Sequence, residues 1–189
     1  MKSNESFLSI HCNSSYSFVI NKSEFIGHAF YVETVDEAEK HILEIREKYH
    51  DATHNCFAYI IGEDKLIQKY SDDGEPSGTA GIPMLEVLRK KDLTNCLVIS
   101  TRYFGGILLG AGGLVRAYTK SVVGALEEAK IVKKIYSLFL QGYNIGSIAS
   151  ILTSEGIRTP RGKEQWYHGT VKSILSNEKY KGDALLQKT

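Results

Sequence analysis

Two histidines and a cysteine stand close together in the first third of the chain. His50 and His54 are four residues apart and Cys56 follows, and these residue types are the ones that bind zinc. A zinc site needs about four such ligands and a supporting set of hydrogen bonds. Cys56 also begins an apolar segment, where a packed thiol is the commoner arrangement. The spacing therefore suggests a metal site without completing one.

Three acids follow in the segment Ser71–Gly81. Asp72, Asp73 and Glu75 have the carboxylates that bind magnesium, although an Asp-Asp-Gly-Glu-Pro run more often makes a turn. With His54 they define an enzyme alternative, a metal-assisted hydrolase. The sequence has no Ser-His-Asp elbow, no P-loop and no G-x-G-x-x-G after a strand. We therefore rank a hydrolase third, after a binding surface and a structural loop, and expect no catalytic residue, metal or cofactor.

Glycines are concentrated between residues 74 and 113, where eight of the 17 lie. They fall in two loops that lead into helices, and glycine allows a close approach of backbone to a phosphate or another chain. The sequence therefore predicts a surface that binds nucleic acid or another partner. The residues expected to form it are Asp72, Asp73, Gly74, Glu75, Ser77, Gly78, Thr79, Gly81, Arg102, Tyr103, Phe104, Gly105, Gly106, Gly110, Gly112, Gly113 and Arg116.

Arg102 has two interpretations within this surface. Its guanidinium stands beside two aromatic residues and is suited to clamp a phosphate or stack on a base. It is equally suited to pair with Asp72, Asp73 or Glu75 and so join the two loops. The two interpretations are compatible, and both stay open at the level of sequence.

The elements that position these loops follow from hydrophobic patterns and turn signals. Thr34 and Glu37 form a capping box before a helix that ends near His50. Gly142 and Gly156 each stop a helix. Strands are expected at 7–11, 16–20, 25–32, 55–62 and from 96 to about 102, and helices at 34–50, 83–88, 114–126, 131–139, 145–152 and 170–175. This order predicts an α+β fold in which helices cover one face of a sheet, followed by a small all-helical segment.

Two long motifs in the first part resemble the IMPACT/YigZ family. They are SDDGEPSGTAGIPMLEVL at residues 71–88 and VISTRYFGGILLGAGGLVRAY at residues 98–118, and the earlier segment 22–59 matches the rest of the family's N-terminal domain. The resemblance covers about residues 5–127. It implies a fold similar to domain IV of elongation factor G. It also implies a cytosolic, non-enzymatic role tied to nucleic acid, ribosomes or translational control.

The last part of the chain resembles the recombinase domain of large serine recombinases over about residues 128–189. The matching residues are Gly156-Ile157, Thr159 to Lys163, Trp166, Thr170-Val171, Ile174-Leu175, Asn177, Tyr180 and Gly182-Asp183. The resemblance implies a helix-turn-helix-like fragment that binds DNA without the catalytic resolvase domain. The residues expected at DNA are Arg158, Arg161, Lys163, His168, Thr170 and Lys172. We thus predict two domains, 1–130 and 131–189, joined near Glu127–Val132 by a stiff helix.

Charge differs between these two parts. Residues 1–130 carry 14 Lys and Arg against 18 Asp and Glu, and residues 131–189 carry nine against four. A basic tail favours duplex DNA as its partner. For the first part we expect RNA or the ribosome, but its acidic charge also favours an alternative, a regulator of translation that binds a protein partner and does not contact nucleic acid directly. No run of eighteen apolar residues and no disulfide pattern among Cys12, Cys56 and Cys96 is present, so we expect a cytoplasmic protein without membrane contact.

Overall fold

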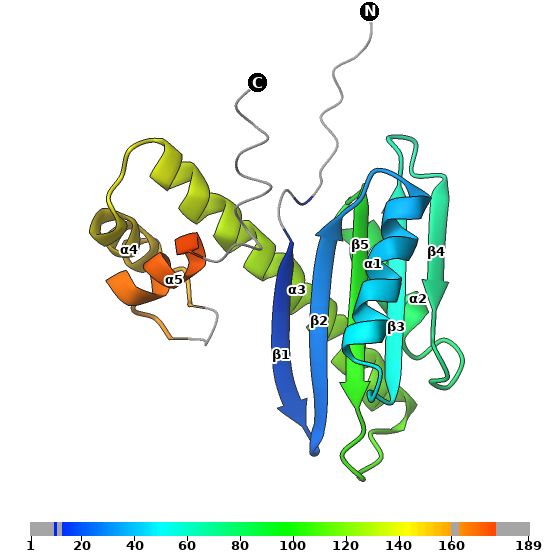
Figure 1. The fold of residues 1–189 in the computed structure, drawn as a ribbon. Coiled ribbons are helices and arrows are strands. Elements are labelled where there is room, and N and C mark those ends of the chain that lie inside the picture. Colours follow the sequence, from blue (N-terminus) through cyan, green and yellow to red (C-terminus); the bar gives the residue numbers. More distant parts are fainter. Residues whose placement is uncertain (1–9, 11–12, 160–162, 177–189) are drawn as a thin grey trace, which may run out of the picture.

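An antiparallel five-stranded sheet and a long helix organise the chain (Figure 1). The computed structural model describes residues 10, 13–159 and 163–176. The strands are β1 (Ser14–Ile20), β2 (Ser23–Tyr31), β3 (His54–Ile61), β4 (Ile67–Ser71) and β5 (Cys96–Tyr103), in the order β1-β2-β5-β3-β4. The helices are α1 (Val35–Lys48), α2 (Gly81–Lys90), α3 (Gly110–Leu140), α4 (Ile145–Ser154) and α5 (His168–Ser176).

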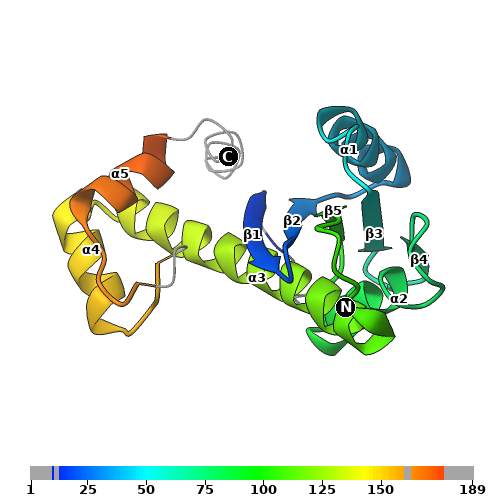
Figure 2. The ribbon, with the colours of Figure 1, turned by 90° about the horizontal axis from the view of Figure 1, so that it is seen from below.

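Helices cover both faces of the sheet, and the prediction that they lie on one face is wrong. In Figure 2, α1 lies on one side of the strands, and α2 and α3 lie on the other. In β3, Cys56, Ala58 and Ile60 belong to the core under α2 and α3, whereas Phe57, Tyr59 and Ile61 belong to the core under α1. A strand that is apolar along its whole length is buried on both faces and needs cover on both. The predicted likeness to domain IV of elongation factor G stays a prediction.

The capping box before α1 forms with a small change in its partners. The Thr34 hydroxyl accepts a hydrogen bond from the Glu37 amide at 3.2 Å. The Glu37 carboxylate accepts from the amide of Glu33 at 2.8 Å, one residue before the cap amide that the pattern predicts. Ala38, Ile42 and Ile45 then face the sheet, at the helical spacing seen in the sequence.

One continuous helix, α3, spans both parts of the chain. It begins at Gly110, four residues earlier than expected, because glycines have low helix propensity and hide the first turn in the sequence. Its 31 residues make a rod about 46 Å long at about 1.5 Å per residue. The stiff helical joint expected near Glu127–Val132 therefore lies inside regular helix. After Leu140 the helix ends as expected at Gly142, whose φ is +90°.

The tail packs as a small unit around the last turns of α3. Ile135, Ile148, Leu152, Trp166 and Val171 form its core. The indole of Trp166 donates to the Ile157 carbonyl at 2.7 Å, which ties the segment before α5 to the chain just after α4. The helix-turn-helix likeness of this unit stays a prediction.

The strand prediction and the structure differ at two places. The strand expected at Phe7–His11 falls outside the described residues, except Ile10, which is buried. β4 was not predicted, since Gln68, Lys69 and Tyr70 are exposed on it and leave no apolar pattern.

No helix among residues 10, 13–159 and 163–176 is both long and apolar enough to cross a membrane.

Gly27 of β2 tests the packing of α3 on the sheet. A Cβ at Gly27 would lie 2.3 Å from the Ser121 carbonyl oxygen, which is backbone and has no room to move aside. We expect Gly27→Ala to lower the free energy of unfolding by about 1–3 kcal/mol through overpacking. The matched control is Gly169→Ala in α5, where a Cβ would meet nothing within 4 Å. Urea denaturation of both variants measures the difference, and equal stabilities would contradict this packing.

Candidate functional site

Asp72 holds the first glycine-rich loop against the start of α2. Its carboxylate accepts hydrogen bonds from the amides of Gly78, Ala80 and Gly81 at 2.9, 3.0 and 2.8 Å. The helix has no side-chain cap of its own at Ala80, so Asp72 satisfies amides that the helix leaves unpaired. A negative charge at a helix N-terminus is also favourable. Asp72 therefore supports the loop and is not free to bind an ion.

Asp73 ties the same loop to α1 and β3. One carboxylate oxygen lies 2.7 Å from a guanidinium nitrogen of Arg46, and the other accepts from the Asn55 amide at 2.6 Å. Its carbonyl lies 2.8 Å from Nδ1 of His54. Sequence reasoning missed Arg46 and Asn55 as partners, because they lie 27 and 18 residues away and carry no local signal.

A buried ion pair joins the two glycine-rich loops. Oε1 of Glu75 lies 2.6 Å from Nη1 of Arg102 and accepts from the Tyr118 hydroxyl at 2.7 Å. Glu75 is 8% exposed and Arg102 is 4% exposed. The Arg102 guanidinium also lies over the rings of Phe25 and Phe104, at 5.4 and 5.3 Å from their centroids. Of the two interpretations of Arg102, the structure therefore shows the ion pair, and Glu75 is its acidic partner.

Burial governs the chemistry of the neighbouring thiol and phenol. The Cys56 thiol donates to the Asp72 carbonyl at 3.0 Å, and burial raises the pKa of Cys56 to about 12. Burial also raises the pKa of Tyr118 above its usual range. A thiol with so high a pKa stays protonated, and thiolate is the form that attacks or binds metal. Cys56 is therefore a packed residue here.

The histidine and acid candidates do not converge on a common point. His50 lies near the Glu47 carbonyl, while His54 lies between the Asp73 carbonyl and Glu75, with Nε2 3.8 Å from Oε1 of Glu75. Among the residues that the structure describes, no three His, Cys, Asp or Glu side chains form a metal-binding group. The arrangement gives the hydrolase alternative no support.

The second loop presents its exposed residues outward from the end of β5 to α3. Phe104 is 44% exposed, Ile107 is 42% and Leu108 is 85%. Gly106 and Gly110 have positive φ, and a Cβ on either would meet nothing within 4 Å. α3 begins here without a side-chain cap. We call Phe104, Gly106, Ile107, Leu108, Gly110 and Arg116 the β5–α3 surface.

The sequence-predicted site residues thus separate into two groups. Asp72, Asp73, Glu75 and Arg102 are engaged in internal bonds, and Thr79 and Gly81 are buried. Tyr103 bonds to Asp51, which raises the pKa of Tyr103 to about 12, and the Gly105 amide donates to Ser23. The exposed or half-buried remainder is Gly74, Ser77, Gly78, Phe104, Gly106, Gly110, Gly112, Gly113 and Arg116.

The expected DNA-binding residues of the tail lie on its surface. Arg158, Lys163, His168 and Lys172 are exposed, and Thr170 is half-buried. Arg161 lies outside the described residues. The Thr159 hydroxyl accepts a hydrogen bond from the Lys163 amide at 3.0 Å. These cations belong to two segments, the α4–α5 loop and α5.

Removal of one partner of the buried pair tests its structural role. We expect Arg102→Met to lower the free energy of unfolding by about 3–5 kcal/mol, because it leaves Glu75 charged and buried. Arg102→Met with Glu75→Met is expected to recover part of that loss. The control is Lys69→Met, which breaks an exposed ion pair with Glu39 and should cost less than about 1 kcal/mol. Urea denaturation measures all three, and an Arg102→Met cost no larger than the control would contradict the role.

Comparisons with known proteins match the two parts of the chain separately. The Impact N-terminal domain family matches residues 21–126, and the Recombinase family matches residues 126–189. IMPACT family member YvyE of Bacillus subtilis (strain 168) is 51% identical over 129 residues, which are 68% of this chain and 59% of that protein. IMPACT family member YigZ of Escherichia coli (strain K12) is 37% identical over 139 residues, covering 70% of this chain and 68% of that protein.

A solved structure shares the fold of the first part. It is described as the crystal structure of a hypothetical protein, and it aligns with a TM-score of 0.62 and 38% identity over 65% of this chain and 60% of the other. The chain spans about three fifths of the length of YvyE and of an IMPACT family member from Haemophilus influenzae, at 59% and 61%. The similarity to Recombinase proteins rests on the tail alone. The match over residues 21–126, more than half of the chain, shows that this protein belongs to the IMPACT family by its N-terminal domain.

Proposed function

We propose that this chain is a non-catalytic IMPACT-family protein that acts in translation regulation by binding RNA or the ribosome through the β5–α3 surface. The observation that carries the proposal is that the two glycine-rich loops have different roles. The carboxylates of Asp72, Asp73 and Glu75 all bind groups inside the protein, so the first loop serves as a scaffold. The second loop is left as the exposed face. The role in translation follows from the family resemblance.

Three features of the β5–α3 surface favour a nucleic acid. The Phe104 ring is exposed and available to stack on an unpaired base, which is how proteins recognise single-stranded RNA. The amides at the start of α3 lie at the positive end of a long helix, which favours a phosphate. Arg116 follows about one and two-thirds turns after the start of α3 and adds a guanidinium to the same end.

A protein partner is the second candidate, and a specific observation favours it. Leu108 and Ile107 are apolar and exposed beside Phe104, and a buried apolar contact is the usual centre of a protein interface. The first 130 residues also carry four more acids than bases, which opposes long-range attraction of nucleic acid. Under this second candidate function, the chain regulates translation by binding a protein and does not contact nucleic acid itself.

The tail is proposed to bind duplex DNA independently of the β5–α3 surface. Arg158, Lys163 and Lys172 are exposed cations on a unit that carries five more bases than acids. Such contacts to phosphates supply affinity and salt dependence rather than sequence reading. We propose DNA binding by the segment that matches the Recombinase family, residues 126–189, and no strand exchange.

Binding of the full chain to structured RNA, single-stranded DNA and duplex DNA across a salt series tests this assignment. We expect Phe104→Ala to weaken RNA binding by about 5- to 150-fold, since one stacked base contributes about 1–3 kcal/mol. Lys163→Ala with Lys172→Ala should leave RNA binding intact and lower the salt dependence for duplex DNA by about two phosphates. Lys40→Ala on α1 is the control, because Lys40 is exposed away from both surfaces.

The outcomes separate the candidates. If no nucleic acid binds at low salt, the RNA and DNA proposals are wrong, and binding of a protein partner becomes the proposed function. If RNA binds but Phe104→Ala matches the control, the β5–α3 surface is not the RNA site. Loss of DNA binding in the Phe104 variant would contradict the independence of the tail.

A further inference from the structure

Two lysines of the sheet domain adopt a backbone conformation that favours glycine. Lys22 has a φ of +62° and Lys65 has a φ of +57°, both in the left-handed region. A residue with a Cβ is strained there, although asparagine and aspartate tolerate the conformation better than other residues do. The other described non-glycine residues with positive φ are all asparagine or aspartate. A lysine at such a position therefore indicates that its ammonium group has a use that offsets the strain.

The ammonium group of Lys65 has such a use inside the protein. Lys65 lies in the turn between β3 and β4, and it is paired with the carboxylate of Asp92. It also donates to the Asp92 carbonyl at 3.1 Å. These bonds join the β3–β4 turn to the chain between α2 and β5. The strain at Lys65 is thus offset by an internal contact.

Lys22 has no equivalent contact. It is the second of the two residues, Asn21 and Lys22, that connect β1 to β2, and both have positive φ, as a type I′ turn requires. Glycine is the usual residue at this second position. Lys22 is exposed, and no carboxylate of the described residues lies within ion-pair distance of it. Its ammonium group is therefore available to a partner outside the chain.

The β1–β2 turn lies directly against the second glycine-rich loop. A Cβ on Gly105 would come within 2.0 Å of the Lys22 carbonyl oxygen, and the Gly105 amide donates to Oγ of Ser23 at 3.2 Å. Phe104 immediately precedes Gly105. In Figure 1 this turn and the end of β5 lie at the same end of the sheet, and the β3–β4 turn lies at the other end. Lys22 therefore stands at the border of the β5–α3 surface.

Two acids at this end of the sheet belong to its opposite face. Glu24 pairs with Tyr103 across β2 and β5, and Asp51 accepts from the Tyr103 hydroxyl at 2.7 Å. Residues paired across two strands share a face, whereas successive residues of one strand point to opposite faces. Arg102 precedes Tyr103, and its guanidinium lies over the Phe104 ring. Glu24 and Asp51 thus lie on the other side of the sheet from the Phe104 ring.

We propose that Lys22 contacts a phosphate of the RNA that binds at the β5–α3 surface, which makes the β1–β2 turn a second part of that site. This inference rests on the proposed function. Phe104 stacks on an unpaired base, and Lys22 meets the backbone of the same strand as a point charge. Arg116 of α3 supplies a second cation, and it also has no carboxylate of the described residues within ion-pair distance.

The change Lys22→Gly in the full chain separates binding from folding. We expect it to raise the urea midpoint of the unbound protein, because glycine adopts this φ without strain. It should weaken binding of an RNA hairpin with a single-stranded loop by roughly five- to tenfold at about 50 mM salt. The slope of log affinity against log salt should fall in magnitude by about 0.7, which is one phosphate on a single strand.

Two further variants control this experiment. Lys22→Arg keeps the charge and should retain both the affinity and the salt slope of the unaltered chain. Lys65→Gly makes the same change in the same backbone conformation at the other end of the sheet. It should leave RNA binding and its salt slope unchanged.

The outcomes distinguish this inference from the proposed function. Failure of the unaltered chain to bind the RNA hairpin would overturn both. If the unaltered chain binds and Phe104→Ala weakens binding, a Lys22→Gly loss no larger than that of Lys65→Gly would overturn the Lys22 contact alone. A lowered urea midpoint in Lys22→Gly, together with weak RNA binding by Lys22→Arg, would show that Lys22 has a structural role and would also overturn the contact.

Discussion

The structure depends on one helix that serves two cores at once. α3 contributes Tyr118, Val122 and Ala125 to the core beneath the sheet and Ile135 to the core of the tail. Among the described side chains of α3, Ala129 is the last that is fully buried in the first core, Tyr136 still packs against that core, and Ile131 already packs against the second. No loop or glycine separates the two sets within α3. Neither core can therefore shift without bending or unwinding the helix that the other core holds.

The position of α3 also determines what the glycine-rich loops can do. Tyr118 comes from α3, Arg102 from β5 and Glu75 from the loop before α2, and the three meet in one buried contact. Leaving any of these groups buried without its partner is costly, so the contact fixes both loops against the sheet. This contact also engages the carboxylate of Glu75, which a catalytic or metal-binding site would need. The exposed part of the second loop remains as a surface for a partner.

Local signals in the sequence predicted the parts of the fold that local physics decides. Thr34 begins α1 and Gly142 ends α3 because a cap hydroxyl and a left-handed glycine act within one turn. The continuous apolar run of β3 predicted a buried strand. It did not show that α1 covers one face and α2 and α3 the other, since a run without alternation has no visible faces. β4 was missed because its residues are exposed and lack any apolar period.

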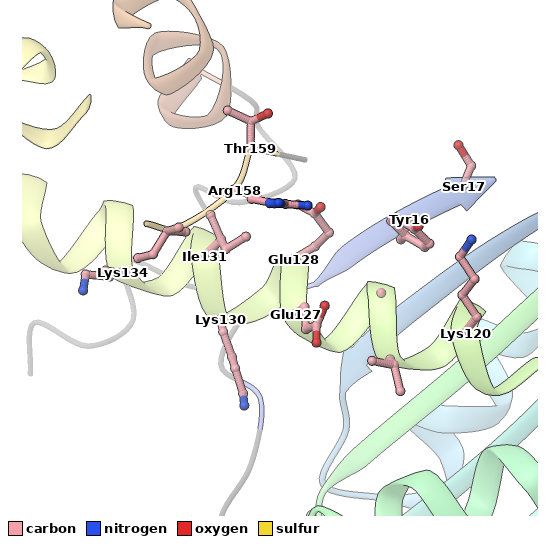
Figure 3. A pocket seen from close by; sticks show the side chains of 13 residues that line it. Tyr16, Ser17, Lys120, Glu127, Glu128, Lys130, Ile131, Lys134, Arg158 and Thr159 are labelled. Carbon is pink, nitrogen blue, oxygen red and sulfur yellow. The ribbon is translucent and has the colours of Figure 1, made fainter. Parts of the chain in front are cut away.

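The candidate site was predicted less well, for a physical reason. The sequence located both glycine-rich loops, but it treated Asp72, Asp73 and Glu75 as one group. The structure gives each acid a different partner, and those partners lie far along the chain. The groove that Tyr16 and Ser17 of β1 form with α3 and the tail was not foreseen at all, because these residues come together only in the fold (Figure 3). Pairing over long sequence distances leaves no period or spacing to detect.

Hydrogen exchange along α3 in the full chain tests the central claim most directly. The account predicts that amides from 127 to 135 exchange as slowly as those of the last buried turns of the sheet core, residues 117–126, with no break between them. Limited proteolysis should then leave this stretch uncut. Fast exchange confined to 127–135, or ready cleavage there, would contradict a single helix shared by the two cores.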